Sequence, residues 1–333
     1  MLMNSMAPDW LWLFFGAVVL LALFVDFVVL RKQGAHEVSV KEALNWSIVW
    51  VALSLAFNGL LWWATWREHG TEIANTRALE FLTGYLIEKS LAVDNIFVFL
   101  MIFTAFVVPA EQQKKALIVG VILAVVLRAV MILIGAWLIS QFSWILYVFG
   151  AFLLVTGIKM WWFAEQQPDL ANNPLIAWIR RHMKVTDQLH GESFFIDKRE
   201  AGRVVRYATP LFLVLVLVEF SDVIFAVDSI PAIFAITTDP FIVLTSNIFA
   251  ILGLRAMYFL LADMADRFSL LKYGLALVLI FIGAKMMLID LYKIPVLVSL
   301  GVVAAIIATS VVLSLRRDAG KRAREALTEG GNA

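Results

Sequence analysis

The sequence predicts an all-α integral membrane protein with about nine transmembrane helices. Its 333 residues are 62% hydrophobic, with a mean hydropathy of +0.87. Apolar runs of about 20 residues, long enough for a helix to cross a bilayer, recur along the chain. The basic residues gather in the connections between these runs. The net charge of +1 gives no reason to expect a nucleic-acid partner, and the absence of cysteine excludes disulfides, thiolate metal sites and cysteine nucleophiles.

Nine apolar segments are the predicted spans. They cover residues 10–30, 44–66, 79–108, 115–139, 142–163, 209–236, 241–262, 270–290 and 293–315. The first segment follows no basic region and is as long as a full span, so we interpret it as a retained helix and not as a cleaved signal peptide. The third and sixth segments are long and interrupted by acids. We therefore consider a broken helix as well as a continuous one for each of them.

The distribution of basic residues predicts the orientation. With the N-terminus outside and the C-terminus inside, most Arg and Lys of the connections face the cytoplasm, as the positive-inside rule requires. The chain is then a single polytopic domain over 1–333, with a cytoplasmic loop at 164–208 and a basic cytoplasmic tail at 316–333. Within that loop, 174–185 has an apolar and a basic face and could lie on the membrane surface. Residues 193–207 could form a short hairpin turning near Ala201 and Gly202, with an ordinary loop as the alternative.

Five carboxylates lie inside two of the predicted spans. They are Glu88 and Asp94 in the third span and Glu219, Asp222 and Asp228 in the sixth. A charge at the bilayer centre costs roughly 2.5–3.5 kcal/mol on insertion scales, so these acids need compensation. Arg128 and Arg255 lie inside spans and are natural charge-balancing partners. Two arginines do not neutralise five acids, so a bound cation or bound protons are the favoured hypothesis over structural ion pairs alone.

An internal repeat relates the two halves of the chain. The matches are DNIF (94–97) with DVIF (222–225), VLRAVMILIGAW (126–137) with GLRAMYFLLADM (253–264), and GIKMW (157–161) with GAKMM (283–287). All three have nearly the same offset, about 127 residues, which favours duplication. Each copy, 79–163 and 209–290, holds three spans, so the copies cross the membrane in opposite directions. Secondary transporters with such inverted repeats bind their substrates near the bilayer midplane.

One cation could gather all five acids only if the backbone unwinds between them. Glu219 and Asp222 share a helical face, whereas Asp228 projects to the opposite face. Pro231 and the nearby serines permit a break, and unwound carbonyls would add oxygen ligands. Asn95, Ser221 and Asn247 are further oxygen ligands by the same reasoning.

The available ligand types narrow the choice of metal ion. All four histidines lie outside the predicted spans, so the site offers only carboxylate, amide, hydroxyl and carbonyl oxygens. Such a set suits Mn²⁺, Mg²⁺ or Ca²⁺ and argues against copper or zinc. Protonation is the competing hypothesis, because carboxylates in a low dielectric take up protons more readily. The two hypotheses are compatible in an antiporter.

The acidic segments resemble a known family. EFSDVIFAVDSIPAIFAITTDPFIVLTSNIFAILGLRAMYFLL (219–261) resembles the signature of the TerC family, EKSLAVDNIFVF (88–99) is similar to its other acidic motif, and the likeness covers about residues 40–315. The resemblance implies a bacterial inner-membrane protein tied to manganese homeostasis, closest to the Alx branch, which is linked to Mn²⁺ export and alkaline pH. It also implies that the five acids named above translocate the metal.

We therefore predict a secondary transporter that exports Mn²⁺ through a midplane acidic site, in exchange for protons. A Ca²⁺ or other cation/proton antiporter is one alternative. A membrane scaffold that assists metal delivery or protein assembly through loop 164–208 is another. The chain has no Walker motif and no intramembrane-protease GxGD motif, so we expect no enzymatic activity and no cofactor. The expected partners are the lipid bilayer, a divalent metal ion and protons.

Overall fold

The computed structural model describes residues 5, 7–33, 40–142, 144–162, 174–200, 203–262, 270–292 and 294–330. Most of these residues are helical. The helices are α1 (Asp9–Gln33), α2 (Val40–His69), α3 (Thr71–Ala105), α4 (Ala110–Gln141), α5 (Ile145–Trp162), α6 (Pro174–His182), α7 (Pro210–Phe234), α8 (Pro240–Leu252), α9 (Leu254–Ala262), α10 (Leu271–Met287) and α11 (Val296–Gly330). Two antiparallel strands, β1 (Phe195–Glu200) and β2 (Arg203–Ala208), form a hairpin between α6 and α7.

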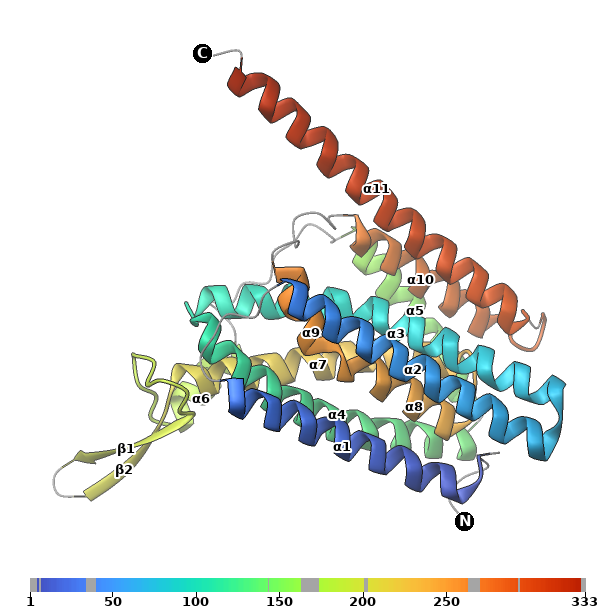
Figure 1. The fold of residues 1–333 in the computed structure, drawn as a ribbon, viewed down its shortest axis with the longest axis horizontal. Helices are drawn as coiled ribbons and strands as arrows, with labels where there is room; N and C mark the ends of the chain where they lie inside the picture. Colours follow the sequence, from blue (N-terminus) through green and yellow to red (C-terminus); the bar gives the residue numbers. More distant parts are fainter. Residues whose placement is uncertain are drawn as a thin grey trace.

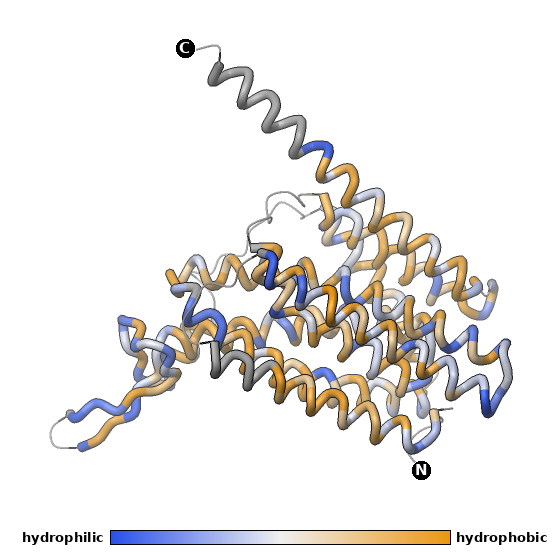
Figure 2. Tube along the Cα trace, viewed as in Figure 1, coloured by the Kyte–Doolittle hydropathy of each residue, from blue (hydrophilic) through white to orange (hydrophobic). Residues whose placement is uncertain are grey.

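The long helices form a bundle in which they run side by side (Figure 1). The N-terminus and the α2–α3 and α10–α11 connections lie at one end of the bundle, and the α3–α4 connection, α6 and the hairpin lie at the other. Hydrophobic residues dominate along the helices, and hydrophilic residues gather in the hairpin and at the α2–α3 connection (Figure 2). Large apolar side chains face outward, such as Leu20 at 71% exposure and Val155 at 66%. An apolar outer surface of this extent suits a lipid environment.

Five helices of the described chain are long and apolar enough to cross a membrane. They are Lys41–His69, Glu111–Gln141, Ile145–Trp162, Pro210–Phe234 and Val296–Arg317. The pair α8 and α9, which bends by 41°, gives a sixth candidate if it is counted as one span. Helices occupy all nine predicted segments, but α3 carries several charges, and α10 and the apolar part of α1, Asp9–Val25, are short. The fold is therefore that of a helical membrane protein with five to six candidate spans, and the nine-span inverted repeat stays a prediction.

The chain bends at a different place from the two predicted spans, the third and the sixth, for which a break was considered. Both acidic helices, α3 and α7, are continuous, and α7 contains Pro231 within its last turn. The Ser221 hydroxyl donates to the carbonyl of Leu217 at 2.8 Å, one turn earlier on the same helix, so this serine does not interrupt α7. The chain instead bends at Gly253, between α8 and α9. The alternative in which unwound backbone in α3 and α7 gathers the acids is therefore wrong.

Helices α5 and α10 approach each other backbone to backbone. A Cβ placed on Gly283 of α10 would lie 2.8 Å from the carbonyl oxygen of Gly150 and 2.7 Å from the backbone nitrogen of Leu154, both on α5. A Cβ on Gly157 of α5 would lie 2.9 Å from the carbonyl oxygen of Ala276. Small residues at helix interfaces permit close packing of this kind in membranes. Gly157 and Gly283 are equivalent positions in the predicted repeat.

The hairpin between α6 and α7 packs against the first turn of α7. The predicted hairpin is confirmed, with Phe195 opposite Ala208 and Glu200 opposite Arg203, while the proposed turn residues 201 and 202 lie outside the described residues. The Phe195 ring packs against that of Phe212 on α7, with ring centroids 4.6 Å apart. These contacts fix the base of the hairpin, and its strands extend away from the bundle (Figure 1).

Candidate metal centre

Four buried polar side chains from four helices meet in the interior of the bundle. Glu88 is the central residue of α3, and Asp222 is the central residue of α7. Arg128 of α4 and Asn247 of α8 complete the group, and none of the four is more than 3% exposed. Each acid thus lies halfway along its helix.

The Arg128 guanidinium is the hub of this cluster. Its Nε and Nη2 donate to the two carboxylate oxygens of Asp222 at 3.0 and 2.6 Å, a two-pronged arrangement typical of strong Arg–carboxylate pairs. Its Nη1 donates to Glu88 Oε1 and, at 3.3 Å, to Asn247 Oδ1. The Asn247 amide donates in turn to Glu88 Oε2 at 2.9 Å. Every polar atom of the two carboxylates thus has a partner.

The cluster carries more negative than positive charge when its acids are ionised. Glu88 and Asp222 share one guanidinium, and Asn247 is neutral. Glu219 lies three residues before Asp222, on the same side of α7. Placing charges in a low-dielectric interior is expensive unless they are paired, so an additional cation at this point would be stabilised.

Glu219 supplies an oxygen that no described group engages. Its Oε2 is buried without a hydrogen-bond partner among the described residues. A cavity of about 20 Å³, enough for one water-sized occupant, is lined by Glu219 and Asp222 and otherwise by apolar side chains and Gly120. A Cβ on Gly120 would lie 3.0 Å from Glu219 Oε1, so the glycine leaves room for the carboxylate. The unpartnered oxygen and the cavity together make Glu219 the best placed residue to receive a cation.

The structure does not bring all five predicted acids together. Asp228 lies beside Thr156 and Lys159 of α5, apart from Arg128, because it projects from a different face of the continuous helix α7. The side chain of Asp94 lies outside the described part of the structure, although its backbone belongs to α3. In the described ranges, no group of three or more His, Asp or Glu side chains is arranged to hold a metal ion. Asp228 is thus separate from the cluster in this structure, and a shared metal centre that includes Asp94 stays a prediction.

The remaining predicted residues take different positions. Asn247 belongs to the cluster, as described. Asn95 is buried and its Oδ1 lacks a partner among the described residues, while the Ser221 hydroxyl is used within α7. Arg255 is buried near the start of α9, immediately after the bend.

Lys89 has a role that the sequence did not reveal. It projects from a different face of α3 than Glu88 and contacts the bend in the neighbouring helix. Its Nζ donates to the carbonyl oxygen of Ala250 at 3.1 Å and lies 2.9 Å from where a Cβ would stand on Gly253. Glu88 and Lys89 thereby hold α8 at two points, through Asn247 and through Ala250. The sequence signal for this contact was a lysine next to Glu88 in an apolar segment, together with Gly253 in a later apolar segment.

The comparisons with known proteins agree with the resemblance. The model of a family described as the integral membrane protein TerC family matches residues 73–322. An Escherichia coli (strain K12) protein is 56% identical over 312 residues, covering 94% of this chain and 96% of the relative. A Salmonella typhi protein is 55% identical with the same coverage, and both relatives are named Alx and provisionally described as membrane-bound redox modulators. An uncharacterized membrane protein of Myxococcus xanthus is 48% identical over 311 residues, 93% of each chain. No solved structure gives a significant match.

Proposed function

Because the chain belongs to the TerC family of integral membrane proteins, we propose that it is a secondary transporter that exports a divalent cation, Mn²⁺ in the first place, from the cytoplasm. In this proposal it lies in the bacterial inner membrane, N-out and C-in, with nine spans and two inverted three-helix repeats. Protons move in exchange for the metal.

One observation carries the proposal. Glu88 and Asp222, at the centres of two helices, share a single guanidinium, and Glu219 beside them has an unpartnered oxygen and lines a small cavity. Carboxylates in apolar surroundings usually mark ion or proton pathways. An all-oxygen set is the kind that Mn²⁺, Mg²⁺ and Ca²⁺ prefer.

In the proposed cycle, Arg128 and the metal compete for the same carboxylates. The guanidinium lies between Glu88 and Asp222 in this conformation and takes the place of the cation. Metal reaching the cavity meets Glu219 first, and its binding to Asp222 draws that carboxylate away from Arg128. When the metal leaves, the guanidinium or protons again balance the acids. Asp94, the repeat counterpart of Asp222, would serve the other half of the cycle.

The relatives' description as redox modulators suggests an indirect effect for this chain. With no cysteine, the chain itself has no thiols for thiol–disulfide exchange. Under the present proposal, a transporter would alter redox balance by changing the amount of a redox-active metal in the cytoplasm.

Metal uptake into proteoliposomes tests the function. We expect Mn²⁺ flux in the wild-type protein, dependent on an imposed pH difference, and its loss in Asp222→Asn and Glu219→Gln, because both variants remove charge at the cavity. Asp290→Asn is the matched control, since this exposed carboxylate accepts a hydrogen bond from Tyr147 and does not belong to the cluster, so flux in this variant should be unchanged. Comparison of Mn²⁺, Mg²⁺ and Ca²⁺ at two pH values gives the metal preference. Normal flux in both cluster variants would overturn the proposal.

A further inference from the structure

Helix α6 lies where the membrane surface should be. Its buried residue Ile176 packs in the same apolar core as Leu211 and Val214, which belong to the first two turns of α7. Since α7 is a candidate span that begins at Pro210, α6 lies at the depth where that span leaves the bilayer. In the N-out orientation, this end of the bundle faces the cytoplasm.

The outward surface of α6 and the segment after it combines an exposed indole with several cations. Trp178 is 58% exposed, and its ring packs against His182 with centroids 4.6 Å apart. Arg180, Arg181 and Lys184 are exposed on the same short stretch. Tryptophan and arginine side by side on a short amphipathic helix are typical of segments that lie in the headgroup region of a membrane.

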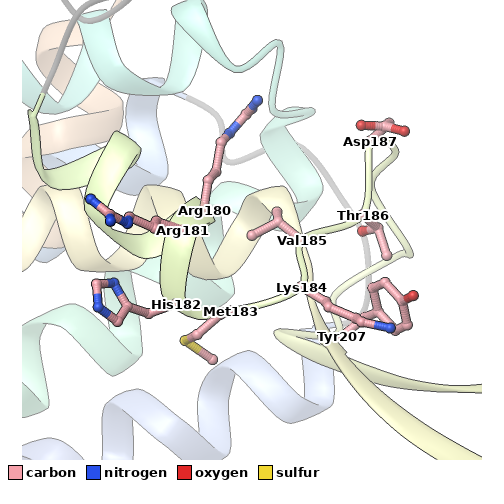
Figure 3. A pocket seen from close by; sticks show the side chains of 9 residues that line it. All are labelled: Arg180, Arg181, His182, Met183, Lys184, Val185, Thr186, Asp187 and Tyr207. Atoms are coloured by element: carbon pink, nitrogen blue, oxygen red, sulfur yellow. The ribbon is translucent and has the colours of Figure 1, made fainter.

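The basic groups spread out and do not converge on one point. A cavity of about 490 Å³ lies at the end of α6, lined by residues 180–187 and Tyr207. Arg180 points to one side of α6 and Arg181 to another, while Lys184 extends along the Tyr207 ring (Figure 3). Asp187 is the acidic side chain that lines this cavity. Divergent cations match an extended layer of negative charges better than they match one small anion.

We propose that α6 and residues 183–187 bind the anionic headgroups of phospholipids in the inner leaflet. Trp178 lies at the boundary between headgroups and acyl chains, and Arg180, Arg181 and Lys184 contact lipid phosphates. Basic residues near an anionic membrane surface contribute about 1 kcal/mol each, or about fivefold in affinity per residue. This inference concerns lipid binding and does not depend on metal transport.

Lipid retention tests the charge part of the proposal. The full-length protein is purified from mixed phosphatidylglycerol and phosphatidylcholine, and the retained lipids are counted by native mass spectrometry. Arg180→Gln with Arg181→Gln should lower the preference for phosphatidylglycerol by about 25-fold, from two residues at about fivefold each. The matched control is Arg199→Gln with Arg203→Gln, which removes the same charge from the exposed hairpin. Equal lipid preference in the two double variants would overturn the proposal.

A depth measurement tests the location. Because the chain has no cysteine, Met183→Cys gives a single site for a nitroxide label, and Val204→Cys gives a water-exposed control on the hairpin. In liposomes containing phosphatidylglycerol, we expect the label at 183 to collide with oxygen and the label at 204 with an aqueous nickel chelate. Two results would refute lipid docking: a label at 183 as accessible to nickel as the one at 204, or displacement of retained lipid by millimolar inorganic phosphate, which indicates a soluble-anion pocket.

Discussion

Replacing Arg128 tests the physical basis of the central cluster. In Arg128→Met, a shorter, unbranched side chain without charge or hydrogen-bond donors takes the place of the arginine. Asp222 loses two hydrogen bonds, and Glu88 loses one. Both carboxylates then remain in a site that is almost fully shielded from solvent, since neither residue is more than 3% exposed.

The expected loss of stability is large. Removing one partner of a buried ion pair costs about 3–5 kcal/mol, because the remaining charge is left uncompensated. Two carboxylates depend on Arg128, so we expect the upper part of this range. Adding Asp222→Asn to Arg128→Met should recover part of the loss, because one of the uncompensated charges disappears.

A divalent cation should stabilise the Arg128→Met protein. If Mn²⁺ binds between Glu88, Asp222 and Glu219, a concentration one hundred times its Kd adds about 2.7 kcal/mol to the free energy of unfolding. The wild-type protein should respond less, because its guanidinium already lies between Glu88 and Asp222. Unfolding is followed in detergent by tryptophan fluorescence, with Mn²⁺ or with a chelator.

Arg77→Gln is the control for these measurements. Arg77 pairs with Glu80 of the same helix at 2.7 Å, and both side chains keep contact with solvent, at 19% and 10% exposure. Arg77 balances one carboxylate that keeps some contact with water, whereas Arg128 balances two that have almost none, so the loss of Arg77 should cost less stability than the loss of Arg128. The reasoning fails if Arg128→Met is destabilised no more than Arg77→Gln. A large loss of stability with no response to Mn²⁺ would show a purely structural ion pair and would contradict the metal site.

Two further predictions concern helix packing. Gly283→Ala should destabilise the protein by about 1–3 kcal/mol in the same unfolding assay, because the added methyl group overlaps the backbone of α5. The control is Gly301→Ala on α11. Open space surrounds Gly301, so this change should be neutral or slightly stabilising. Lys89→Met should lower stability by about 1–3 kcal/mol, because the carbonyl of Ala250 loses its charged partner. Amide hydrogen exchange in α8 and α9 should rise in Lys89→Met, and unchanged exchange there would contradict this role for the lysine.

Much of the fold follows from local pattern. The length of the apolar runs predicted where helices lie, and a hairpin turning near Ala201 and Gly202 was one of two alternatives for residues 193–207. The acids of α3 and α7 were visible as charges in apolar segments, and Arg128 was expected to balance them. The structure places Arg128 against both Glu88 and Asp222, as such a role requires.

Helix continuity was harder to predict, because it depends on tertiary contacts. Pro231 and Ser221 permit a break in α7, yet the proline lies near the end of that helix and the serine bonds within it. Gly253 does mark a bend, and there the ammonium of Lys89 from another helix contacts a carbonyl at the end of α8. Once α7 is continuous, Asp228 must project away from Asp222, so the two acids were grouped only because a break was expected between them.

The close approach of α5 and α10 limits how the protein can move. Their backbones touch at Gly150, Gly157 and Gly283, so these two helices have little freedom to separate or to slide. In the predicted repeat they are the last helices of the two halves. If the two halves tilt against each other during transport, they should pivot about the α5–α10 contact. The helices that change their spacing are then α3, α4, α7 and α8.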